Sequence, residues 1–135
     1  MKIFIVEDNF HVQEALVCML KDKGYEISGT AESAKDALVG IDLSRPDLCI
    51  IDMTLDGTAS GLELAQHLLD HEGLVSLIIT GDIYRIPEIS RATTPHLVKP
   101  FTSRDLCRML EDLAGLTPLS SPVGAPAAVG QAASV

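Results

Sequence analysis

Reactive side chains directly follow four short apolar runs of the chain. Glu7 and Asp8 end the first run, Asp52 ends the second, Thr80 ends the third and Lys99 ends the last. Carboxylates are established nucleophiles toward phosphoryl groups, whereas a lysine and a hydroxyl can bind phosphate oxygens. If these five residues converge, they have the chemistry for phosphoryl transfer to an aspartate.

The acidic residues also predict a metal ion. Glu7, Asp8 and Asp52 would repel one another strongly at close range unless a cation lay between them. A ligand set of oxygen atoms, without histidine or cysteine, favours a hard cation such as Mg²⁺. We therefore expect Mg²⁺ at this site, with Mn²⁺ as a possible substitute.

Each member of the set has an expected role in the transfer. Asp52 is the expected nucleophile because the apolar run before it, residues 48–51, would hold it rigidly. Lys99 would pair with the phosphate, and Thr80 would donate a hydrogen bond to another phosphate oxygen. Gly81, directly after Thr80, would leave room for the phosphate near the backbone.

The elements that must position these residues alternate between strands and helices. Residues 3–6, 48–51 and 77–79 predict buried strands, and residues 25–30 and 96–98 predict weaker ones. Helical periodicity occupies the intervals, and Pro87 predicts a short or bent fourth helix. Five strands alternating with five helices predict an α/β domain with helices on both faces of a parallel sheet. Ligands of such sheets bind beyond the carboxyl ends of the strands.

Composition sets the domain organisation and excludes several functions. The 135 residues suit one domain, over residues 1–116, whereas residues 117–135 carry no charge, are rich in Ala, Pro, Gly and Ser, and predict a disordered tail. A net charge of −9 argues against direct binding of nucleic acid. No apolar run reaches the roughly 18 residues of a membrane span, so we expect a soluble cytoplasmic protein.

The three cysteines predict reduced thiols. Cys18, Cys49 and Cys107 are widely spaced, form no CxxC pair and lie in apolar runs. This odd number argues against a secreted disulfide framework. We expect all three to behave as small hydrophobic core residues.

Five segments together resemble the response-regulator receiver domain, over Lys2 to about Ala114. They are IVED at residues 5–8, IID at 50–52, SGLEL at 60–64, ITG at 79–81 and VKPF at 98–101. The resemblance implies a flavodoxin-like, doubly wound (βα)5 sandwich with strand order 2-1-3-4-5.

The resemblance also implies a role for each matching residue at the metal. Asp52 matches the phosphorylated aspartate, and Asp8 matches the direct Mg²⁺ ligand. Glu7 matches the acid that reaches the metal through water. Thr54 lies where the family uses a backbone carbonyl as a further ligand.

The switch residues match the family only in part. Thr80 and Lys99 resemble the switch hydroxyl and the phosphate-binding lysine, and Asp82 lies where receivers tune dephosphorylation. The family usually has Tyr or Phe three residues before the lysine, but this chain has His96. His96 could still rotate inward and make the switch sensitive to pH.

The function implied by the resemblance is that of a phosphorylation switch. The donor would be a phosphohistidine on a sensor kinase or a phosphotransfer protein, and the phosphorylated domain would bind a downstream partner that the sequence does not identify. The domain would also dephosphorylate itself without being a separate enzyme. It could dimerise through its last helix, and the chain could be a free protein or a piece of a hybrid kinase.

Two alternatives remain open at this stage. One is a pseudo-receiver, which keeps the fold as an interaction module without phosphorylation. The other is a haloacid-dehalogenase-like phosphohydrolase, because Asp56-Gly57-Thr58 resembles the end of that family's signature. Thr54 stands where that signature requires an acid, which argues against the second alternative.

Overall fold

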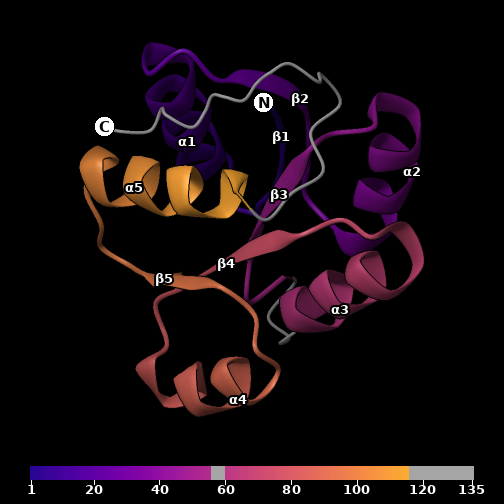
Figure 1. Cartoon of the computed structure of the whole chain (residues 1–135), viewed down its shortest axis with the longest axis vertical. Helices are drawn as coiled ribbons and strands as arrows, with labels where there is room; N and C mark the ends of the chain where they lie inside the picture. The colour runs from indigo at the N-terminus through magenta and orange to yellow at the C-terminus, as the bar shows by residue number, and fades with distance from the viewer. Residues whose placement is uncertain (56–59, 116–135) are drawn as a thin grey trace.

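A parallel five-stranded sheet forms the centre of the computed structural model, which describes residues 1–55 and 60–115 (Figure 1). The strand order is β2-β1-β3-β4-β5, which confirms the predicted doubly wound fold. The elements are, in chain order, β1 (Lys2–Val6), α1 (Phe10–Asp22), β2 (Glu26–Ala31), α2 (Ala34–Ser44), β3 (Leu48–Asp52), α3 (Ser60–Glu72), β4 (Ser76–Thr80), a 3₁₀ turn (Ile83–Arg85), α4 (Ile86–Arg91), β5 (His96–Val98) and α5 (Ser103–Ala114).

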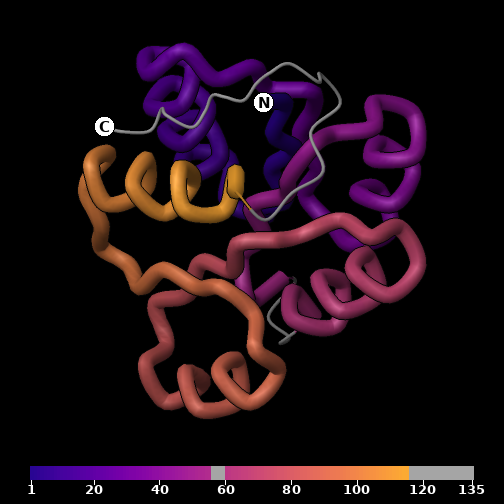
Figure 2. The backbone as a smooth tube through the Cα atoms, viewed as in Figure 1, coloured from indigo at the N-terminus to yellow at the C-terminus, as the bar shows by residue number. Residues whose placement is uncertain are grey.

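Helices cover both faces of the sheet, and alternate strand residues divide the core between them. Figure 2 shows α1 beside α5, with α2 and α3 on the other side of the strands. The α1 and α5 side buries Ile3, Ile5, Ile50, Leu77 and Ile79 of the strands. The opposite side buries Phe4, Val6, Cys49, Ile51 and Ile78. Apolar burial on both faces explains why the central strands are continuous apolar runs.

Local sequence signals determine where several helices begin. Asn9 caps α1 by accepting a hydrogen bond from the backbone N–H of Val12. Thr102 and Asp105 form a capping box at α5, in which each side chain accepts from the other residue's backbone N–H. These caps fix the points at which the chain turns back from the sheet into a helix.

The fourth helix is short, as Pro87 predicts. A 3₁₀ turn over Ile83–Arg85 leads into α4, which has six residues. Pro87 lies in the first turn of α4, where its missing N–H would have no intrahelical partner. The segment between Thr80 and β5 therefore contains little regular helix.

The prediction that all three cysteines are core residues is wrong for Cys18. All three thiols are free, as predicted, but Cys18 is exposed on α1 and Cys107 is only partly buried. Cys49 is buried in β3, where burial raises the pKa of its thiol. Periodicity misleads at Cys18 because an apolar run through an amphipathic helix includes residues of the outer face.

Two predictions of the sequence analysis lie outside the described residues. The first is the domain boundary at residue 116 with a disordered tail at 117–135. The second is the resemblance of Asp56-Gly57-Thr58 to a phosphohydrolase signature. Both stay predictions.

Gly61 allows α3 to start directly against the end of β3. A Cβ atom at this position would overlap the carbonyl oxygen of Asp52 and lie 2.8 Å from the Cα atom of Met53. The Gly61 N–H donates to the carbonyl oxygen of Met53 at 3.0 Å. Any side chain here would push α3 away from the peptide unit that follows Asp52.

We expect Gly61→Ala to lower the free energy of unfolding by about 1–3 kcal/mol, the usual cost of forcing atoms into a packed site. Urea denaturation measures the change. Gly115→Ala is the matched control, because its added Cβ would make only an ordinary contact, 3.7 Å from the Asp112 carbonyl oxygen. Equal stability of the two variants would contradict the close approach at Gly61.

Candidate metal centre

Three acidic side chains meet at the carboxyl edge of the central strands. Glu7 and Asp8 follow β1, and Asp52 is the last residue of β3, which pairs directly with β1. One carboxylate oxygen from each residue lies within 4.8 Å of the others. The acids that the sequence analysis expected to converge are therefore neighbours in the fold.

Lys99 supplies the positive charge of this cluster. Its Nζ atom lies 3.5 Å from Glu7 Oε1 and 3.8 Å from Asp52 Oδ2. Lys99 directly follows β5, and its backbone N–H donates to the carbonyl oxygen of Thr80 at 2.8 Å. The lysine therefore reaches from the edge strand, past β4, to acids on both central strands.

Glu7 is the most deeply buried member of the cluster, with 1% of its surface exposed. Its Oε2 atom accepts a hydrogen bond from the Asn9 backbone N–H at 3.1 Å. Among the described residues, Oε1 has no hydrogen-bond donor, because its contact with Lys99 is long. Burial raises the pKa of Glu7 to about 7, and nearby Asp52 adds to this rise, whereas the Asn9 N–H and Lys99 oppose it.

Asp52 lies nearer the surface than Glu7. Its side chain is 12% exposed, and its Oδ1 atom accepts from the backbone N–H of Thr54 at 3.3 Å. Oδ2 faces Lys99. Thus one oxygen of Asp52 is anchored by the backbone while the other faces the lysine at the rim of the sheet.

The donor set fits a hard divalent cation. The three carboxylates supply only oxygen ligands, and Asp8 is exposed where a hydrated ion could approach. The buried Oε1 atom of Glu7 has no donor of its own among the described residues, and a metal-bound water would provide one. The role of the Thr54 carbonyl stays a prediction, although Thr54 adjoins the site through its N–H.

The structure gives Thr80 and Asp82 local partners in a turn. Thr80 is buried at the end of β4, and its hydroxyl accepts from the Asp82 backbone N–H at 3.0 Å. The Asp82 carboxylate accepts from the Tyr84 N–H at 3.0 Å and lies 3.8 Å from Arg85 Nε. A rotation of the Thr80 side chain away from this turn would break its contact with the Asp82 N–H.

His96 lies in β5, half buried, where it pairs with Ile78 of β4. It belongs to the same short strand that leads into Lys99. This position is compatible with a switch that couples β5 to the site, but the role of His96 stays a prediction.

Two residues near the site were missed by the sequence analysis. Gly61 packs against the backbone after Asp52, and Gln13 is buried on α1 beside the end of β1. Gln13 is in helical phase with Leu16 and Leu20, which face the sheet. A polar residue on an otherwise apolar inner face was the signal that could have revealed it.

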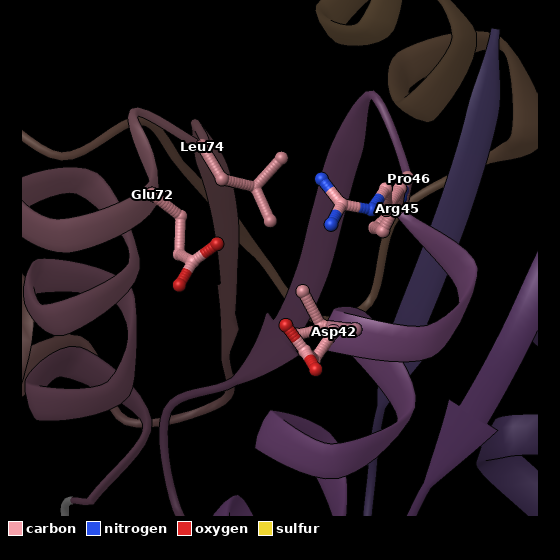
Figure 3. A pocket seen from close by; sticks show the side chains of 6 residues that line it. Asp42, Arg45, Pro46, Glu72 and Leu74 are labelled. Carbon is pink, nitrogen blue, oxygen red and sulfur yellow. The ribbon is translucent and has the colours of Figure 1, made fainter.

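The hollow shown in Figure 3 is separate from the acidic cluster. It has a volume of about 200 Å³ and lies between the ends of α2 and α3, beside the starts of β3 and β4. Its charged lining residues are Asp42, Arg45 and Glu72. It therefore lies at the amino edge of the sheet, opposite the edge that carries Asp52.

His67 and His71 on α3 form no part of the acidic cluster. Both are exposed, their rings stack with centroids 4.3 Å apart, and the His67 carbonyl oxygen lies 3.1 Å from His71 Nδ1. They are surface residues of this helix.

Comparison with known proteins gives a consistent family assignment. Residues 3–111 match the family model described as response regulator receiver domain. The regulatory protein VanR of Enterococcus faecium is 32% identical over 108 residues, which cover 78% of this chain and 46% of VanR. The DNA-binding transcriptional activator DevR/DosR of Mycobacterium tuberculosis is 30% identical, covering 83% of this chain and 54% of that protein. The chain thus spans about half the length of these curated relatives.

Solved structures show the same similarity. A putative response regulator from Chloroflexus aurantiacus J-10-fl superposes with a TM-score of 0.75 at 30% identity. The match covers 84% of this chain and 97% of that one. Within residues 1–55 and 60–115, no helix is long and apolar enough to cross a membrane.

The raised pKa of Glu7 predicts a pH-dependent stability of the metal-free protein. The folded state binds the proton of the Glu7 carboxyl group more tightly than the unfolded state does, in which the pKa of Glu7 is near 4.5. The resulting stabilisation is complete below pH 4.5 and is lost as pH rises through about 7. Glu7→Gln stays neutral, so we expect it to flatten this decline and to be more stable than wild type at pH 8, by roughly 1–3 kcal/mol.

Urea unfolding between pH 4 and pH 8 in EDTA measures this difference. Glu14→Gln, on the exposed side of α1, is the control and should follow the wild-type profile. If Glu7→Gln and wild type change in parallel over this range, Glu7 does not titrate there.

Proposed function

This chain belongs to the response-regulator receiver family, and on that premise we propose that Asp52 accepts a phosphoryl group from a phosphohistidine in a Mg²⁺-dependent reaction. The main support is one arrangement of charges. Three carboxylates lie within 4.8 Å of one another, and Lys99 Nζ contacts two of them. A site with this balance can hold a cation and then an anion, which phosphoryl transfer requires.

Burial favours Asp52 over Glu7 as the nucleophile. Glu7 is almost fully enclosed, and its raised pKa keeps a substantial fraction protonated near neutral pH. Asp52 is partly exposed, and the Thr54 N–H fixes one of its oxygens. The other oxygen faces Lys99, where a phosphoryl group would arrive.

We assign the metal ligands from the same cluster. Asp8 and Asp52 would bind Mg²⁺ directly, together with the backbone carbonyl of Thr54, and Glu7 would bind through water. When bound, the cation would neutralise charge on the carboxylates and on the incoming phosphoryl group. Mn²⁺ could substitute because it accepts the same oxygen ligands.

The proposed phosphoryl transfer from the donor histidine to Asp52 needs no further reactant. An Asp52 carboxylate oxygen forms a bond to phosphorus while the bond from phosphorus to the donor histidine nitrogen breaks. The electron pair of that bond stays on the histidine nitrogen, and the product is an acyl phosphate on Asp52. The Lys99 ammonium, already 3.8 Å from Asp52 Oδ2, pairs with the new phosphate.

The switch would follow from the loss of existing contacts. The Thr80 hydroxyl now accepts from the Asp82 N–H, so turning toward a phosphate would alter the turn that leads into the 3₁₀ segment and α4. This change would expose or reshape a surface for a downstream protein or for a second copy of the chain. Water would later remove the phosphate, at a rate that Asp82 could tune, in a domain that carries no separate catalytic unit.

The proposed partners follow from the family. The donor is a sensor histidine kinase or a histidine phosphotransfer protein, and the proposed location is the cytoplasm. The two relatives VanR and DevR/DosR are about twice as long as the matched region, and DevR/DosR is a DNA-binding transcriptional activator.

We expect the protein to gain the mass of one phosphoryl group when incubated with acetyl phosphate and Mg²⁺. Intact-mass spectrometry measures the gain, which EDTA and Asp52→Asn should each abolish. Asp42→Asn, at the opposite edge of the sheet, is the matched control and should be phosphorylated like wild type. An unmodified wild-type protein would point to a pseudo-receiver, and modification of Asp52→Asn would point to another acceptor.

We expect His96→Tyr to remove only the part of the pH dependence that His96 gives to the structural response to phosphorylation, because tyrosine stays neutral between pH 6 and pH 8. Amide chemical shifts of β5 and α4, recorded with and without acetyl phosphate, measure the response. If wild type and His96→Tyr respond identically at pH 6 and at pH 8, then His96 does not make the switch sensitive to pH.

A further inference from the structure

Gln13 is the one polar residue among the buried residues of α1. Only 8% of its surface is exposed, and it shares the inner face of the helix with Leu16 and Leu20. A buried carboxamide is unfavourable unless its polar atoms are hydrogen-bonded. The buried side-chain amide of Gln13 therefore requires hydrogen-bond partners within the protein.

Gln13 finds its partners at the ends of two strands. The Nε2 atom donates to the carbonyl oxygen of Glu7 at 3.1 Å and to that of Ala31 at 3.3 Å. The Glu7 backbone N–H donates to the same Ala31 carbonyl at 3.0 Å. One side chain thus joins α1 to the carboxyl ends of β1 and β2.

The Glu7 carbonyl has a special place in the site. It belongs to the planar peptide unit that links Glu7 to Asp8, so its direction fixes where the Asp8 Cα atom lies. Beyond β1, this unit is no longer held by the ladder that pairs β1 with β3, which ends at Val6. Gln13 is therefore a side chain that holds the carbonyl end of the peptide between the two acids.

We propose that Gln13 is a positioning residue that sets the relative orientation of Glu7 and Asp8, and through it the affinity for the divalent cation. This inference rests on the proposed function, because it concerns the same metal centre. Residues that orient metal ligands without binding the metal typically change its affinity by about 10- to 100-fold when replaced.

A simple packing role would have different consequences. If Gln13 only filled space, a side chain of similar length without a donor would replace it with little effect on the acids. Gln13→Met supplies that side chain and removes both hydrogen bonds. Gln13→Lys keeps an N–H donor on a chain long enough to reach the two carbonyl oxygens.

The first measurement is made on metal-free protein and does not depend on the proposed function. Amide hydrogen exchange at Asp8 and Asn9 reports how firmly the peptide after Glu7 is held, since the Asn9 N–H donates to Glu7 Oε2. We expect exchange at these two amides to be about tenfold faster in Gln13→Met than in wild type. In Gln13→Lys we expect it to be slower than in Gln13→Met. Unchanged exchange in Gln13→Met would overturn the inference.

The second measurement is the dissociation constant for Mn²⁺, obtained by electron paramagnetic resonance of the free ion. We expect it to rise about tenfold in Gln13→Met and to recover in part in Gln13→Lys. Gln66→Met is the matched control, because Gln66 is exposed on α3, where its side chain donates to Asp70. It should bind Mn²⁺ like wild type.

The outcomes separate this inference from the proposed function. If wild type binds Mn²⁺ and is phosphorylated, but Gln13→Met binds Mn²⁺ within twofold of wild type, then Gln13 does not position the acids. If wild type binds no Mn²⁺, the metal centre itself is wrong, and hydrogen exchange alone decides whether Gln13 holds the Glu7–Asp8 peptide.

Discussion

Mutual repulsion among three carboxylates is the constraint on which the arrangement of this domain depends. Glu7, Asp8 and Asp52 are brought within 4.8 Å of one another by adjacent parallel strands. Burial makes a negative charge on Glu7 still less favourable, because Glu7 has little access to water, and its pKa rises to about 7. Lys99 relieves part of the repulsion in the metal-free state. The remaining negative charge is the driving force that we propose for binding a divalent cation.

Rigid support around the acids keeps this unfavourable arrangement from relaxing. The apolar strands before Glu7 and Asp52 are buried on both faces, so neither end can move without disturbing the core. Gly61 lets α3 pack against the peptide after Asp52. Gln13 binds the carbonyl after β1 from the other side of the sheet. Helices on both faces thus contribute to the position of groups that they do not contain.

The opposite flank of the site is formed by short elements. Thr80 leads into a turn, a 3₁₀ segment and a six-residue helix, and His96 is half buried in β5. Hydrogen bonds within this flank are local, such as those between Thr80, Asp82 and Tyr84. Local contacts of this kind can exchange for contacts to a phosphate without unfolding the core. The contrast between a buried acidic side and a flank held by local turn contacts supports the two-state switch that we propose.

The sequence by itself determined the strands, the strand-end positions of the reactive residues and the short fourth helix, because apolar runs, caps and Pro87 act over short distances. The resemblance to a family supplied the strand order. Only the tertiary structure decided that Cys18 is exposed, that Gly61 has no room for a side chain and that Gln13 binds the Glu7 carbonyl. These facts depend on contacts between segments far apart in the chain, and no local pattern encodes the distance between them.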